Sequence, residues 1–247
     1  MASSSETGHV KNVTNFEGLI TSVTAFGETY NPTRESIKLP ALQALIGTAK
    51  ASLNALNMAQ SAYSIAVAAR ESAFLPFGTL ITRVKNAIKA TDTSTQIDDS
   101  VETIVRKIQG RRAGAKITDE QKAALLAEGK ESIQISVAQL SYDSKLENFD
   151  KLIMLLSSVP EYNPNEEELK VDTLKALYTE LQSKNLEVLI ATIQLSNARI
   201  ARNNILYKLQ TGLVDTAVDA KIYIKSVYGA SSPQYRQISK LSFAVRS

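Results

Sequence analysis

Apolar side chains recur every three or four residues along two long stretches of the chain, a spacing that places them on one face of an α-helix. The two series are Leu42, Leu45, Ile46, Ala49, Leu53 and Leu56, and Leu174, Leu177, Leu181, Leu186, Leu189 and Ile193. We expect one helix from Pro40 to about Phe74 and another from Asp172 to about Leu209. At 1.5 Å per residue, each helix is about 50 Å long.

Shorter helical patterns fill most of the remaining chain. They cover 15–26, 80–90, 94–108, 118–158, 213–228 and a last segment that ends near Leu241. The period-two alternation typical of a strand is confined to 37–39 and 169–171. The pattern therefore predicts an all-α fold.

The chain also carries an internal repeat. Its aligned pairs are 15–20 with 148–153, Tyr30-Asn31-Pro32 with Tyr162-Asn163-Pro164, 35–45 with 167–177, and Ala69-Arg70 with Ala201-Arg202. The offset stays at 132 to 133 residues across helix, loop and helix, which predicts a tandem duplication. We therefore expect an antiparallel bundle of long helices, built from two tandem units related by a pseudo-twofold axis.

The expected domain organisation follows from the repeat. Residues 1–10 are polar and are expected to form a flexible tail, and 11–109 form the first helical unit. Residues 110–117 contain two glycines and three basic side chains, so they are expected to form a linker. The second helical unit spans 118–247.

Composition excludes several classes of chemistry. The 247 residues include no cysteine, so thiol catalysis, thiolate-bound zinc and disulfides are ruled out within this sequence. The single histidine, His9, lies in the expected tail, and no glycine-rich phosphate loop occurs. We therefore predict no catalytic, cofactor-binding or metal-binding residues, no small-molecule substrate, and a protein that is not an enzyme.

Two groups of polar residues are candidate sites. The first is the densest basic stretch, which reads either as a solvated linker or as a contact for phosphates and nucleic acid. It consists of Arg106, Lys107, Arg111, Arg112 and Lys116. The net charge of the whole chain is only +3, which permits an anionic partner without requiring one.

The second group surrounds the end of the second long helix, where Arg202 repeats Arg70. We predict an interhelical polar network that fixes the angle between helices, with a ligand-binding pocket as the alternative. Its members are Arg70, Asn197, Arg199, Arg202, Asn203, Asp215 and Asp219.

The chain begins without the apolar core of a secretory signal, which predicts a cytoplasmic protein. Residues 51–69 carry no charge over about the length that spans a bilayer. Six serine, asparagine and glutamine side chains interrupt this stretch, so we interpret it as a central helix of the bundle rather than a membrane span.

Four segments of the second unit together resemble a group of helical bacterial proteins, chiefly from Bacteroidota, for which we know no activity. They are Tyr162–Glu166, Leu195–Asn203, Gly212–Asp215 and Ser226–Tyr235. The first unit shares the resemblance only through the repeat. It implies a bacterial, cytoplasmic source and no particular chemistry.

Three hypotheses for function remain. The leading one is a non-enzymatic helical scaffold or interaction protein that acts by self-association or by binding another protein, because duplication often fuses what was a symmetric dimer. The second is a weak nucleic-acid-associated protein that uses the basic stretch. The third is a membrane-active protein that opens to expose the charge-poor region 51–82.

Overall fold

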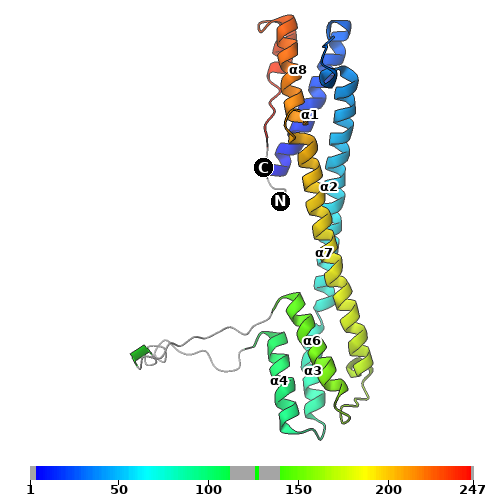
Figure 1. Cartoon of the computed structure of the whole chain (residues 1–247). Coiled ribbons are helices and arrows are strands. Elements are labelled where there is room, and N and C mark those ends of the chain that lie inside the picture. The colour runs from blue at the N-terminus through cyan, green and yellow to red at the C-terminus, as the bar shows by residue number, and fades with distance from the viewer. Residues whose placement is uncertain (1–3, 112–125, 128–139, 246–247) are drawn as a thin grey trace. The chain divides into compact units, whose positions relative to one another are not determined.

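The computed structural model describes residues 4–111, 126–127 and 140–245, and within these ranges the chain forms helices and no strand (Figure 1). The all-α prediction is therefore confirmed. The α-helices are α1 (Ser4–Phe26), α2 (Leu39–Phe74), α3 (Phe77–Lys89), α4 (Thr95–Gln109), α6 (Tyr142–Ser157), α7 (Val171–Tyr207), α8 (Leu213–Tyr228) and α9 (Pro233–Ser239). Single 3-10 turns cover Gly27–Thr29, Glu35–Ile37 and Glu167–Leu169.

The two long helices are present where the periodicity predicts them. Helix α2 has 36 residues and α7 has 37, and each begins one residue before the predicted start. Helix α2 ends at Phe74, two residues before Pro76, which disfavours helical geometry in the residue that precedes it. Helix α7 ends at Tyr207, and Gln210 just beyond it has a left-handed φ of 66° that breaks the helix.

The helix expected over 118–158 is described only in part. Helix α6 begins at Tyr142, because the Ser141 hydroxyl accepts a hydrogen bond from the Ser144 amide at 3.1 Å and so caps the helix. The expected start at Thr118 lies outside the described residues.

The N-terminus differs from the expected flexible tail at 1–10. Helix α1 begins at Ser4, and His9 is buried, with its Nδ1 atom 2.5 Å from the Tyr207 hydroxyl. Asn12 donates to the same hydroxyl at 3.2 Å. The Asn12 side chain also bonds to the backbone of Ala244 in both directions, at 2.7 and 3.2 Å. From the sequence alone, polar residues of this kind predict a solvated tail. In the structure, hydrogen-bond partners about 200 residues away hold the side chains of His9 and Asn12 in place.

The chain divides into two compact units whose boundaries differ from those of the predicted units. The first, here called the terminal unit, comprises 1–64 and 191–247, and the second, the central unit, comprises 65–190. The terminal unit therefore contains α1, the start of α2, the end of α7, α8 and α9. The central unit contains the end of α2, α3, α4, α6 and the start of α7.

Each unit buries one hydrophobic core, and each core draws on both halves of the sequence. In the terminal unit, Phe16, Leu19 and Leu42 are buried together with Leu206, Leu213 and Ile224. In the central unit, Phe77, Ile81 and Ile88 are buried together with Phe149, Leu152 and Leu174. The ring centroids of Phe77 and Phe149 lie 4.9 Å apart, nearly edge to face. Neither half of the chain contains a complete core.

The two Tyr-Asn-Pro loops have the same local structure. The buried Tyr30 hydroxyl donates to the Ile37 carbonyl at 2.6 Å, and Tyr162 donates to the Leu169 carbonyl at 2.8 Å. Burial is the main cause that raises the pKa of both phenols, to about 12 for Tyr162. Each phenol thus ties the start of its connector to the residues just before a long helix.

The shared cores predict that the two halves of the chain fold only together. When 1–111 and 140–247 are expressed as separate chains, we expect each alone to be largely unfolded, because it lacks half of both cores. Co-expression should give a 1:1 helical complex, measured by light scattering and circular dichroism. Two halves that each fold as independent monomers would contradict the shared cores.

The tyrosine loops predict a loss of stability at high pH. A raised folded-state pKa stabilises the fold below the unfolded value near 10, and this stabilisation is lost as the pH rises toward 12. In an ultraviolet titration of this tryptophan-free chain, Tyr30 and Tyr162 should ionise only well above pH 10. Tyr162→Phe should cost about 1 kcal/mol at neutral pH and should reduce the alkaline loss. A tyrosine titration that is complete near pH 10 in the folded protein would contradict this.

Candidate interaction surface

The basic stretch predicted from the sequence lies on a surface of mixed charge. Arg106 and Lys107 are in the last turn of α4 and Arg111 follows the helix, whereas Arg112 and Lys116 lie outside the described residues. The Arg106 guanidinium donates to the Thr103 hydroxyl at 3.0 Å, on its own helix.

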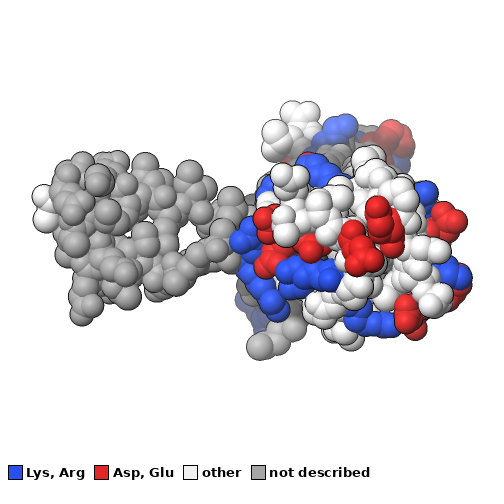
Figure 2. Space-filling view, turned by 90° about the horizontal axis from the view of Figure 1, so that it is seen from below, with Lys and Arg blue, Asp and Glu red and all other residues white. Residues whose placement is uncertain are grey.

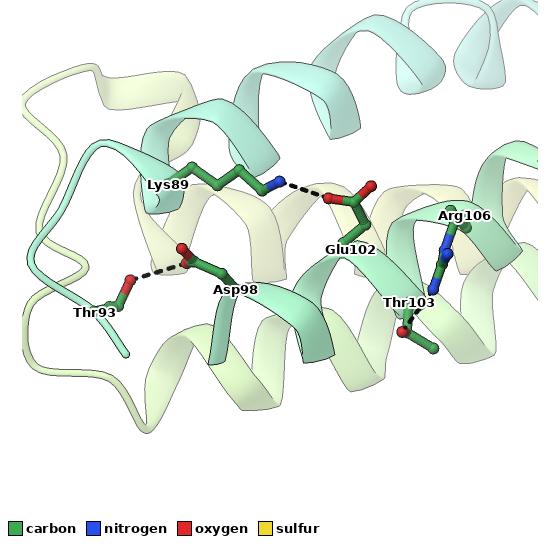
Figure 3. A network of polar contacts seen from close by, with 6 residues as sticks. All are labelled: Lys89, Thr93, Asp98, Glu102, Thr103 and Arg106. Atoms are coloured by element: carbon green, nitrogen blue, oxygen red, sulfur yellow. Dashed lines mark hydrogen bonds and ion pairs between the residues drawn. The ribbon is translucent and has the colours of Figure 1, made fainter. Parts of the chain in front are cut away.

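Acidic groups on α4 offset these cations. The Lys89 ammonium of α3 pairs with the Glu102 carboxylate at 2.5 Å, and Thr93 donates to Asp98 at 3.0 Å (Figure 3). The Lys89 hydrogen bond lowers the pKa of Glu102, which keeps this carboxylate charged. Basic and acidic side chains also lie side by side on the face drawn in Figure 2. The described side chains of α3 and α4 therefore do not form a patch of a single sign, the kind of patch that concentrates nucleic acid.

The predicted polar network is divided between the two units. In the central unit, the Arg70 guanidinium lies 4.0 Å from the centre of the Tyr142 ring and donates to the Asn185 side chain at 3.0 Å. Asn185 in turn donates to the Asp143 carboxylate at 2.6 Å. In the terminal unit, Arg202 is buried and donates through Nε and Nη2 to the side-chain oxygen Oδ1 of Asn203 at 3.1 and 2.9 Å.

The remaining network candidates have other roles. The Asp215 carboxylate accepts a hydrogen bond from the backbone N–H of Gln210 at 2.7 Å, just before α8, and Asp219 pairs with Arg34 at 2.6 Å. Asn197 and Arg199 are exposed on α7. Arg34 lies in the connector before α2, far from Asp219 in sequence, so helical spacing alone could not identify this pair.

Open grooves on the central unit do not bring these candidates together. One groove, of about 620 Å³, lies between α3 and the second Tyr-Asn-Pro loop and includes Arg83, Asn86 and Asn163. Arg83 is paired with Glu168. Across the described ranges, no three His, Cys, Asp or Glu side chains form a group that could hold a metal ion.

Helix α7 carries large aliphatic side chains on two opposite faces. One face is buried and includes Leu181, Val188, Leu195 and Leu206. The other face, here called the α7 stripe, comprises Leu186, Leu189, Ile190, Ile193 and Ile200, whose exposed fractions range from 46% to 56%. An exposed row of this kind differs from the scattered apolar residues of an ordinary protein surface.

The α7 stripe corrects one sequence expectation. Leu186, Leu189 and Ile193 were expected on the apolar face that packs into the bundle, whereas they are exposed. Both faces carry aliphatics at helical spacing, so the periodicity could not tell which of them is buried. The charge pattern holds a signal, because no charged residue occurs from 188 to 198, although half of these positions or more are exposed.

The hydropathy of α7 is too low for the stripe to belong to a membrane-spanning helix. No helix in the described ranges is both long and apolar enough to cross a bilayer.

Comparison with known proteins assigns the chain to no family. No family model, curated protein or solved structure matches it.

The different burial of two arginines on α7 predicts different costs of substitution. Arg202→Ala should lower the free energy of unfolding by about 2–4 kcal/mol, because it removes a packed side chain and its bonds to Asn203. Arg199→Ala, at an exposed position on the same helix, should change it by less than about 0.5 kcal/mol. Urea unfolding followed by circular dichroism measures both. Equal costs would contradict the burial of Arg202.

Proposed function

We propose that this protein is a non-enzymatic helical interaction protein that binds a partner helix through the α7 stripe. One observation carries the proposal. The five aliphatic side chains of the stripe remain half exposed on a helix whose opposite face is buried. A helix that is apolar on both faces is typical of a helix covered on both sides.

Binding a partner helix would remove the stripe side chains from the water that they still contact, and this burial stabilises the complex. Full burial of a leucine or isoleucine stabilises by about 1.5–3 kcal/mol, so covering five half-exposed ones contributes on the order of 4–8 kcal/mol. That is a substantial fraction of the free energy of a specific complex. No charged side chain from 188 to 198 would have to lose its hydration on binding.

The arrangement of the cores supports a proposal about origin. The aligned tyrosine loops favour a tandem duplication, and each core contains helices from both copies of the repeat. Fusion of two copies that had exchanged helices as a dimer gives such cores. In this proposal, self-association preceded the present chain.

A photo-crosslinking amino acid placed at residue 193 tests the proposed function in cells that express the full chain. We expect adducts between this protein and a partner of defined mass, because Ile193 lies at the centre of the stripe. The same group at residue 199, exposed on α7 but outside the stripe, is the matched control. A residue-193 variant that forms no more adducts than the residue-199 variant would contradict the proposal.

A further inference from the structure

We infer that the partner of the α7 stripe is a second copy of this chain, with two α7 helices side by side, parallel and in register, so that Asn197 of one copy meets Asn197 of the other. This inference rests on the proposed function and specifies its partner.

The first argument is the repeat of the stripe along α7. Leu186, Ile190, Ile193, Asn197, Ile200 and Asn204 follow one another at alternating spacings of four and three residues. This heptad pattern is typical of the seam where two helices pack knobs into holes. The seam spans 19 positions, or about 27 Å at 1.5 Å per residue.

The second argument is the position of the asparagines. In heptad notation, Ile190, Asn197 and Asn204 occupy position a, and Leu186, Ile193 and Ile200 occupy position d. An asparagine at position a of an apolar seam specifies a two-stranded arrangement and its register, because two such amides bond to each other across the interface; Asn197 has this place inside the seam, and Asn204 lies at its end. Asn197 has aliphatic neighbours on the seam on both sides, at Ile193 and Ile200, and is exposed.

The positions that flank the seam from 189 to 203 are uncharged. The flanking positions e and g from 189 to 203 are Leu189, Gln194, Ser196, Ala201 and Asn203. None is charged, so two identical helices meet without the like-charge contacts that normally select an unlike partner. The nearest acidic flank, Glu187, is already paired with Lys184 at 3.0 Å on the same helix.

The expected strength follows from the size of the seam. Fewer than three heptads form a small interface, but α7 is already held as a helix by its buried face, so association need not order it. We therefore expect a reversible dimer that dissociates on dilution, with a dissociation constant on the order of micromolar.

Cysteine substitution gives the most direct test, because the native chain contains none. In the full chain under a mildly oxidising glutathione buffer, Asn197→Cys should form a covalent dimer within the noncovalent one, since facing a positions bring Cβ atoms into disulfide range. Arg199→Cys, exposed on the same helix but off the seam, should form at least tenfold less. Equal dimer yields, or no dimer from Asn197→Cys, would overturn the parallel in-register pairing.

Sedimentation velocity across a range of concentrations supplies the second test. The native protein and Arg199→Glu should show the same concentration-dependent dimer, whereas Ile193→Glu should be monomeric with an unchanged circular dichroism spectrum. A native protein that is monomeric at about 100 µM, or an Ile193→Glu variant that still dimerises, would overturn the inference. If residue 193 crosslinks to a different protein while the native chain is monomeric, the proposed function stands and self-pairing fails.

Discussion

The structure depends on α7 having two faces. Leu174 and Leu181 complete the core of the central unit, and Leu206 completes that of the terminal unit. Because burial of these side chains fixes the rotation of the helix, the residues half a turn away must point outward. Within each unit, the exposed residues of the stripe therefore follow from the burial of the other face of α7.

The same constraint explains why the two halves of the sequence depend on each other. The first half supplies α1 and the start of α2 to one core and α3 and α4 to the other, and the second half supplies the complementary helices. A break in either half would leave both cores open to water. Partners far apart in sequence, such as Asn12 and Ala244, reinforce this interdependence near the chain ends.

Much of this fold could be predicted from local patterns, and the limits have physical causes. The all-α class and the extents of α2 and α7 follow from helical periodicity and from breakers such as Pro76. The burial of His9 could not be predicted, because it depends on Tyr207, which is 198 residues away. The pairing of Asp219 with Arg34 could not be predicted for the same reason, because the two residues are far apart in the sequence. The stripe was misassigned because Leu186 and Val188 are equally apolar, and only the packed core decides which is covered.

Hydroxyl-radical footprinting of the full chain at low and high protein concentration tests the two-faced helix most directly. Val188 and Leu195 should resist oxidation at both concentrations, because they belong to the buried face. Leu186, Ile193 and Ile200 should be oxidised in dilute solution and protected at high concentration, while Leu209, which is 82% exposed beyond the end of α7, stays reactive throughout. Stripe residues oxidised equally at both concentrations, or reactive Val188 and Leu195, would contradict this role of α7.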